Sequence, residues 1–295
     1  IRDRCKAELI SGEFEMGKHI DKAISEEEKA QGKVLLCCTT AKSDLKINVP
    51  GFNQNALPVR TLPVRIETIE IKHDVALLRL ALPKAPSFAF YAGQYIDLLL
   101  PGNISRSYSI ANSPDQEGVL ELHIRKRENG VCSEMIFGAE PKIKEKGIVR
   151  VKGPLGTFTL QQDSDKPIVL LATGTGYAPI RSILLDLIHQ NSERPVHFYW
   201  GARQQEDLYA LEEAEALIGR LKNAKFSPVL SKPDSDWKGE NGYVQNVAAQ
   251  NYPDLSQYEV YACGSPEMTE NAQSLLTQNC ALPEDAFFCD AFSPA

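Results

Sequence analysis

Four consecutive residues, Arg106-Ser107-Tyr108-Ser109, combine a guanidinium, a phenol ring and hydroxyl groups. The guanidinium, the phenol and a hydroxyl stand at alternate positions, so on an extended strand we expect all three to project from one face. Arg106 can hold a pyrophosphate through its planar fork, Tyr108 can lie against a flavin ring, and Ser109 can reach a ring nitrogen. The same four residues also fit an ordinary strand that enters a turn at Ser113-Pro114.

A glycine-containing loop, Thr173-Gly174-Thr175-Gly176, lies between a buried-type strand at 167–172 and an amphipathic helix. Glycines allow a tight turn and the close approach of backbone to phosphate oxygens. Pro179 suits the first turn of a helix, whose N-terminal amides bind anions. The usual dinucleotide fingerprint ends in Gly or Ala rather than Pro, so a plain strand-to-helix turn remains the alternative. A flavin-like strand earlier in the chain favours a pyridine nucleotide site.

The composition is that of an ordinary globular protein with enough apolar residues for more than one core. The chain has 295 residues, 43% hydrophobic and 24% charged, with a formal charge of -7. This predicts two domains and part of a third, and the negative charge argues against nucleic acid binding. The sequence has no apolar run long enough for a membrane span and no apolar signal core, so we expect a cytoplasmic protein without a membrane partner. Its seven cysteines are too sparse for a disulfide framework.

Strand patterns divide the chain after its first 49 residues. Residues 50–62 are rich in Pro and Asn and predict a linker. The domain expected at 63–162 has short alternating apolar strands and one short helix near 133–138, which predicts an antiparallel Greek-key β-barrel. In the domain expected at 163–295, strands alternate with helices, which predicts a doubly wound α/β domain with a parallel sheet.

The order and spacing of these motifs resemble the ferredoxin-NADP reductase superfamily over about residues 60–292. The resemblance implies that FAD binds to the barrel domain and NADH or NADPH to the α/β domain. It assigns cofactor-binding roles to Arg106, Ser107, Tyr108, Ser109, His123, Arg125, Gly130, Val131, Cys132, Ser133, Thr173, Gly174, Thr175, Gly176, Pro179, Arg203, Cys263 and Gly264. It assigns catalytic roles to Ser109, Cys263, Asp290 and Phe292, with Phe292 covering the flavin. A buried strand position for Cys263 and a core position for Phe292 are the alternatives.

Residues 1–49 resemble the C-terminal part of a plant-type 2Fe-2S ferredoxin, a partial β-grasp segment. Cys5 matches the third cluster ligand and Cys37 the fourth, at the end of an apolar strand that begins at Val34. Arg2 stands at the position of the second ligand, and the first would precede the chain. A 2Fe-2S cluster, expected for a complete family member, needs four ligands. We therefore expect flavin without a stoichiometric cluster, and two buried cysteines without metal are the alternative.

With such a segment in front, the chain resembles the reductases of oxygenases and, most of all, the CDP-6-deoxy-delta-3,4-glucoseen reductases. The resemblance implies an NAD(P)H-dependent flavoprotein that passes electrons to an oxygenase or dehydratase component. An electron-carrier subunit and a flavin reductase without a bound prosthetic group are the alternatives. Ser231-Lys232 stand where NADP-specific relatives often have Ser-Arg, and the loss of the bidentate arginine favours NADH.

Overall fold

The computed structural model describes residues 6–17, 24–49 and 57–292. The chain divides into two compact units, 1–56 and 57–295, which we describe separately. Cys5 lies outside the described residues, as does the side chain of Cys37.

The first unit contains small antiparallel sheets. Strands β3 (Lys33–Leu35), β1 (Lys6–Ser11) and β5 (Lys46–Asn48) form one sheet, and β2 (Phe14–Met16) pairs with β4 (Thr39–Ala41). Helix α1 (Glu26–Ala30) begins at a capping box, in which Ser25 and Glu28 satisfy each other's backbone amides. The apolar strand expected from Val34 to Cys37 ends at Leu35, because Leu36–Cys38 form the short 3-10 helix η2.

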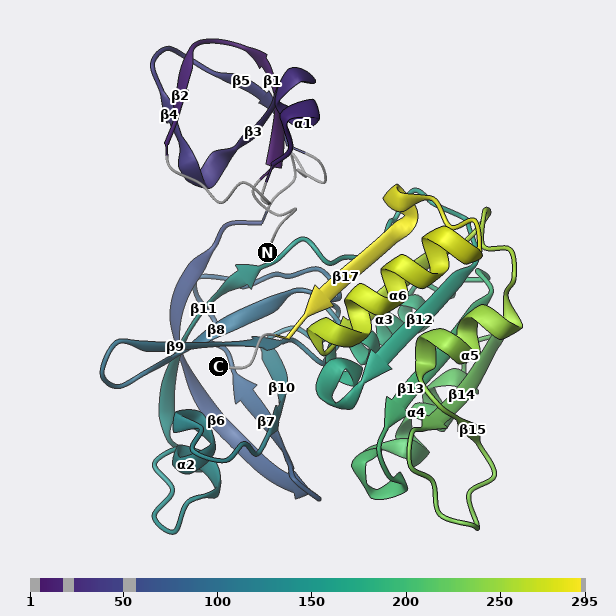
Figure 1. Cartoon of the computed structure of the whole chain (residues 1–295). Helices are drawn as coiled ribbons and strands as arrows, with labels where there is room; N and C mark the ends of the chain where they lie inside the picture. Colours follow the sequence, from purple (N-terminus) through teal and green to yellow (C-terminus); the bar gives the residue numbers. More distant parts are fainter. Residues whose placement is uncertain (1–5, 18–23, 50–56, 293–295) are drawn as a thin grey trace. The chain divides into compact units, whose positions relative to one another are not determined.

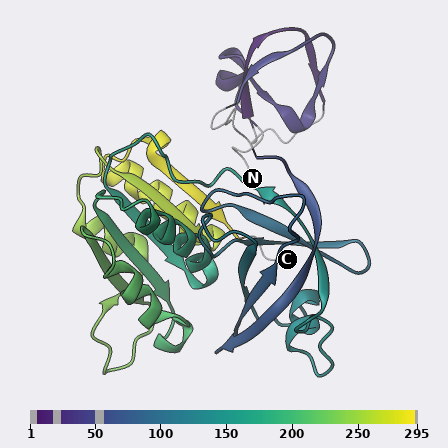
Figure 2. The ribbon, with the colours of Figure 1, turned by 180° about the vertical axis from the view of Figure 1, so that it is seen from behind.

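The second unit begins with a six-stranded antiparallel sheet, in the order β10-β7-β6-β11-β8-β9 (Figures 1 and 2). Its strands are β6 (Arg60–Lys72), β7 (Val75–Ala81), β8 (Tyr95–Leu100), β9 (Ile104–Ser109), β10 (Val119–Arg125) and β11 (Ile148–Leu155). A bridge between Ile110, directly after β9, and Leu122, in the middle of β10, joins the two edge strands and closes the sheet into a barrel. Helix α2 (Val131–Phe137) follows β10. The expected antiparallel barrel is confirmed, and its first strand begins at Arg60, ahead of position 63.

The rest of the unit is a parallel six-stranded sheet in the order β15-β14-β13-β12-β16-β17. Its strands are β12 (Ile168–Thr173), β13 (Val196–Ala202), β14 (Ala224–Leu230), β15 (Glu240–Asn241), β16 (Glu259–Gly264) and β17 (Phe287–Ala291). Its helices are α3 (Tyr177–His189), α4 (Leu211–Ile218), α5 (Val244–Asn251) and α6 (Pro266–Asn279). The expected doubly wound α/β domain is confirmed.

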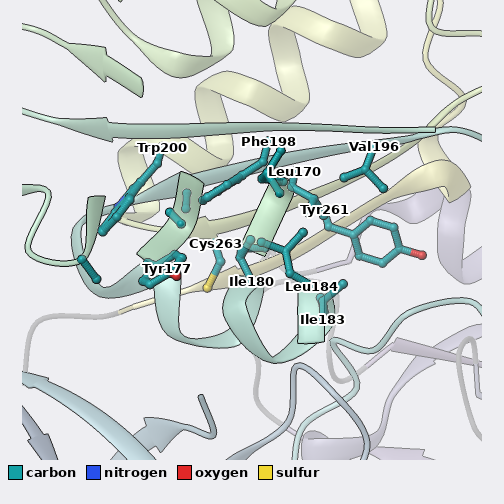
Figure 3. Packing of buried hydrophobic residues seen from close by; sticks show 14 of the residues in the cluster. Leu170, Tyr177, Ile180, Ile183, Leu184, Val196, Phe198, Trp200, Tyr261 and Cys263 are labelled. Carbon is teal, nitrogen blue, oxygen red and sulfur yellow. The ribbon is translucent and has the colours of Figure 1, made fainter. Parts of the chain in front are cut away.

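Alternate residues of β12 face two separate cores. Leu170 packs with α3 and α4, whereas Leu171 packs with α5 and α6. Figure 3 shows the first core, in which Ile180 and Leu184 of α3 lie against Phe198 and Tyr261 of the sheet. The expected apolar face of α3 is therefore buried, at about 2 kcal/mol gross per large side chain.

The chain leaves β12 through α3 to reach β13 on one side, and β16 lies on the other side of β12. The order of the strands thus reverses at the carboxyl ends of β12 and β16, which is where open α/β sheets bind their ligands. Within the described part of the chain, every helix is too short or too polar to cross a membrane.

Candidate functional site

The carboxyl ends of β12 and β16 pack backbone against backbone. A Cβ atom on Gly176 would lie 2.1 Å from the carbonyl oxygen of Cys263, and one on Gly264 would lie 2.1 Å from Oγ1 of Thr173. Gly264 also has a φ of +148°, which L side chains rarely adopt. Two motifs far apart in the sequence, Thr173–Gly176 and Cys263–Gly264, therefore meet at the point where the strand order reverses.

The C-terminal motif lies at the same edge. Strand β17 pairs with β16 in a register that sets Asp290 opposite Cys263, and the backbone N–H of Phe292 donates to the carbonyl oxygen of Gly264 at 2.7 Å. Asp290 is buried, and Phe292 packs against the core that contains the fully buried Cys263. The structure thus brings together the residues expected on the nicotinamide side, while their catalytic roles stay predictions.

The barrel contributes Arg125 to this edge. A Cβ atom on Gly174 would lie 3.4 Å from Nη1 of Arg125, so the guanidinium faces the glycine loop. Arg125 is held by the carboxylate of Asp74, with Nε and Oδ2 3.3 Å apart, and Nη2 donates to the carbonyl oxygen of Asp207 at 3.3 Å. On the other side of the loop, Nε1 of Trp200 donates to the carbonyl oxygen of Gly174 at 3.0 Å. A permanent positive charge therefore stands beside a loop suited to phosphate.

Pro179 lies in the first turn of α3, as predicted, and Gly174–Gly176 form a tight 3-10 turn before it. No side chain caps the N-terminus of α3. Of its first backbone amides, that of Tyr177 donates to the carbonyl oxygens of Gly174 and Thr175, and Pro179 has none, so Ala178 is the residue of this turn whose N–H could meet an anion.

On the flavin-like strand β9, Arg106 and Tyr108 share one face. The hydroxyl of Tyr108 meets the thiol of Cys132, and burial, followed by this contact, raises the pKa of Tyr108. The charges of Arg106 and Arg127 act on the same phenol in the opposite direction. Burial likewise raises the pKa of the Cys132 thiol, so this group is not a nucleophilic thiolate.

The expectation that a serine hydroxyl joins Arg106 and Tyr108 on one face is wrong. Strand β9 continues through Ser109, so Ser107 and Ser109 project to the opposite side from Arg106 and Tyr108. Ser107 donates to Oδ1 of Asp97 at 2.7 Å, and Ser109 is buried. A contact from Ser109 to a flavin ring would have to use its backbone.

The turn before α2 lies close to the arginines. Gly130 is the N-cap residue of α2, and Oγ of Ser133 accepts from the backbone N–H of Arg127 at 2.8 Å. A Cβ atom on Gly130 would lie 3.1 Å from that oxygen, whereas Val131 is exposed. Arg106, Arg127 and the uncapped start of α2 form a cradle with two positive charges, which suits a pyrophosphate.

Two predicted residues lie apart from these clusters. Arg203 is exposed beyond the end of β13, where its carbonyl oxygen accepts from the N–H of Lys232 at 3.0 Å. His123 is buried between Tyr209 and Glu121, with 2.8 Å from Nδ1 to the tyrosine oxygen and 3.2 Å from Nε2 to Oε1 of Glu121. Both polar atoms of His123 are thus used within the protein, so a direct contact with a cofactor has no support here.

The structure brings to the site several polar residues that no sequence motif indicated. Arg127, Arg181, Ser182 and Trp200 belong to none of the expected motifs. For Arg181 and Ser182 the available signal was their position in α3 directly after the glycine loop, among residues of a buried helical face. In the described residues no group of three His, Cys, Asp or Glu side chains is placed to hold a metal ion.

Known proteins match both domains. The family model for an oxidoreductase FAD-binding domain matches residues 64–160, and that for an oxidoreductase NAD-binding domain matches residues 170–274. A CDP-6-deoxy-L-threo-D-glycero-4-hexulose-3-dehydrase reductase of Yersinia pestis is 41% identical over 293 residues, covering 99% of this chain and 86% of the relative. The reductase component of a propane 2-monooxygenase from a Gordonia species is 33% identical over 305 residues, covering 100% and 87%.

Solved structures agree with these matches. A cytochrome P450 reductase of Amycolatopsis aligns with a TM-score of 0.81 and 28% identity, over 99% of this chain and 88% of that chain. A ferredoxin reductase in carbazole 1,9a-dioxygenase aligns with a TM-score of 0.72 at 23% identity, over 98% and 86%, and supports the fold.

Proposed function

Because this chain belongs to the ferredoxin-NADP reductase superfamily and is an FAD- and NAD(P)H-dependent oxidoreductase, we propose that it oxidises NADH and passes the electrons to a protein partner. FAD, when bound, accepts two electrons together and can release them singly. The observation that carries the proposal is the meeting of Thr173–Gly176, Cys263–Gly264 and Phe292 at one edge of the sheet, beside Arg125 of the barrel.

The barrel residues fit FAD. Arg106, Arg127 and the backbone amides that begin α2 would hold its pyrophosphate, and Tyr108 would lie against its ring system. The contact of its hydroxyl with the thiol of Cys132 would help to orient the phenol. Ser109 would contribute its backbone, since its side chain lies on the other side of the strand.

The α/β domain fits a pyridine nucleotide. The amide of Ala178, in the turn after Gly176, would bind the pyrophosphate, and Arg125 would reach it from the barrel. Cys263 and Asp290 would line the nicotinamide side, and Phe292 would exclude water from it. Arg203 lies beside Lys232, where an adenosine phosphate would bind. A lysine lacks the bidentate fork of an arginine, which favours NADH over NADPH.

The partner proposal rests on the relatives. One is named as the reductase of a dehydrase and another as the reductase component of a monooxygenase. We therefore propose that the electron acceptor of this chain is a dehydratase or oxygenase component in the cytoplasm. Cys5 and Cys37 would be two of the four ligands that a 2Fe-2S cluster needs in a complete family member, and Arg2 stands at the position of another. We propose that this chain binds flavin without a stoichiometric cluster.

The proposed FAD cradle can be tested by replacing Arg106. We expect Arg106→Ala to weaken FAD binding by about 2 kcal/mol, roughly thirtyfold, because a charge-assisted bidentate contact is lost. Arg150→Ala, at an exposed position on β11, is the matched control and should keep its flavin. The measurement is the FAD content after desalting, together with a titration of the apoprotein. Full flavin content and unchanged affinity in Arg106→Ala would remove Arg106 from the cradle.

A further inference from the structure

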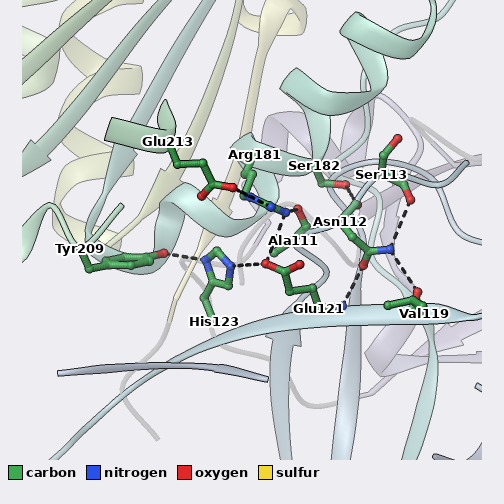
Figure 4. Close-up of polar contacts among 10 residues, drawn as sticks. All are labelled: Ala111, Asn112, Ser113, Val119, Glu121, His123, Arg181, Ser182, Tyr209 and Glu213. Carbon is green, nitrogen blue, oxygen red and sulfur yellow. Dashed lines mark hydrogen bonds and ion pairs between the residues drawn. The ribbon is translucent and has the colours of Figure 1, made fainter. Parts of the chain in front are cut away.

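A polar seam joins the barrel to helix α3 (Figure 4). Nη1 of Arg181 donates to the carbonyl oxygen of Ala111 at 2.8 Å, and Oγ of Ser182 donates to the carbonyl oxygen of Asn112 at 2.6 Å. Nη1 of Arg181 also lies 3.4 Å from Oε1 of Glu121 on β10. Two consecutive residues of α3 therefore hold two consecutive backbone carbonyls of the barrel.

The seam connects the two candidate cofactor loops by a short path. Ala111 and Asn112 lie two and three residues after Ser109, where the flavin-like strand β9 ends. Arg181 and Ser182 lie in the second turn of α3, directly after the glycine loop that ends at Gly176. A shift of α3 against the barrel would thus move one loop relative to the other.

The charged side chains of the seam are partly buried, and they are paired. Arg181 has a side-chain exposure of 13%, and Glu213 of α4 accepts from its Nε and Nη2 at 2.9 and 2.7 Å. Burial opposes its charge, but Glu121 and Glu213 raise the pKa of Arg181, so the guanidinium stays protonated. Burial alone would raise the pKa of Glu121, yet the contacts with His123 and Arg181 lower it overall. Nε and Nη2 of Arg181 thus share one oxygen of Glu213 while Nη1 faces Glu121, and lysine cannot reproduce this fork of donors.

His123 and Tyr209 continue the hydrogen bonds of the seam beyond Glu121. Burial lowers the pKa of His123, so the ring is neutral near pH 7. The tautomer that satisfies both neighbours has Nε2–H donating to Glu121 and Nδ1 accepting from the hydroxyl of Tyr209. Asn112 is held in the same way, because its Oδ1 accepts from the N–H of Glu121 at 2.9 Å and its Nδ2 donates to the carbonyl oxygen of Val119 at 3.1 Å.

We infer that Arg181 is a positioning residue for hydride transfer, which sets the separation between the nicotinamide and flavin sites without touching either cofactor. The inference rests on the proposed function. Hydride transfer moves two electrons and one proton from the nicotinamide carbon to the flavin, and it needs the two reacting atoms about 3 to 3.5 Å apart. A small displacement of one domain therefore slows this step more than it weakens the binding of either cofactor.

The test compares Arg181→Ala and Arg181→Lys with Arg194→Ala, in the FAD-loaded chain. Arg194 is an equally buried arginine paired with a carboxylate, but it lies at the opposite end of the parallel sheet. For Arg181→Ala we expect flavin reduction at saturating NADH to fall by about tenfold or more, while the Kd for NADH changes by less than about threefold and FAD stays bound. Arg181→Lys should recover only part of the rate. Hydrogen exchange should increase in α3 and at residues 111–112, a readout that does not depend on activity.

A purely structural role for Arg181 predicts another pattern. Arg181→Ala would then unfold at a lower temperature, like Arg194→Ala, but would reduce its flavin at the parent rate, and this result would overturn the inference. A large rise in the Kd for NADH at an unchanged limiting rate would overturn it too, since Arg181 would then be a binding residue. If Arg181→Ala does not fold, Ser182→Ala replaces it in the test. An unchanged rate of flavin reduction in Ser182→Ala would then overturn the inference. Failure of the parent chain to bind FAD or react with NADH would instead refute the proposed function.

Discussion

The two ends of the parallel sheet are built in opposite ways. At the amino end, Arg194 donates to the carbonyl oxygens of Lys166 and Gln161 at 2.8 and 3.1 Å, and to Oε2 of Glu259 at 2.8 Å. The hydroxyl of Tyr261 donates to the same carboxylate oxygen at 2.8 Å, and accepts from the N–H of Gln161 at 3.0 Å. These groups hydrogen-bond to one another. Through Gln161 and Lys166 they hold the segment that connects the barrel to the α/β domain.

At the carboxyl end of the sheet, glycines and a helix start without a side-chain cap take the place of such contacts. Gly174 and Gly264 have positive φ values of +54° and +148°, and the start of α3 has no side-chain cap. Positive charge enters from the barrel through Arg125 rather than from the sheet itself. We therefore propose that the amino end of the sheet contributes mainly to stability and the carboxyl end to ligand binding, so substitutions at the two ends should separate these properties.

The largest effect on stability is expected at the amino end. Glu259→Ala would leave the buried Arg194 without its carboxylate, and we expect the free energy of unfolding to fall by about 3–5 kcal/mol. Chemical denaturation measures this loss. The limiting rate of flavin reduction by NADH in the folded variant should stay within about twofold of the parent. A variant that is as stable as the parent but slow would reverse the assignment of the two ends.

At the carboxyl end, Gly264→Ala should affect function more than stability. The new Cβ would collide with Thr173 and force the two motifs apart, so we expect kcat/KM for NADH to fall by about a hundredfold, or about 2.7 kcal/mol. Gly242→Ala is the matched control, because Gly242 also has a positive φ but open space around its Cα. Equal losses in steady-state assays of both variants would show that backbone strain, and not close packing, is responsible.

A smaller effect is expected where side chains line the nicotinamide side. Cys263→Ala should slow flavin reduction by about tenfold, or about 1.4 kcal/mol, with little change in the flavin spectrum. Phe292→Ser should improve the use of NADPH relative to NADH. Stopped-flow rates that match the parent in both variants would remove these residues from the site and leave them as parts of the core.

Much of this arrangement could be predicted from the sequence, because local patterns determine it. The apolar face of α3 and the alternation in β10 predict their elements well, and the glycine loop is recognisable from its place between a strand and a helix. Ser109 is an odd number of positions away from Arg106 and Tyr108, so its side chain lies on the other face of β9. The expectation that it shares their face was wrong. The seam could not be predicted, since Arg181 and Ala111 are 70 residues apart and no local pattern records their contact.

Anaerobic mixing of the FAD-loaded chain with NADH, followed at the flavin absorbance, tests the proposed function directly. We expect rapid, stoichiometric bleaching of the bound flavin, and a slower or weaker reaction with NADPH. Subsequent addition of a one-electron acceptor should restore the oxidised spectrum. A flavin that stays oxidised at saturating NADH, in a chain that retains FAD after desalting, would contradict the central claim that the two sites form one redox centre.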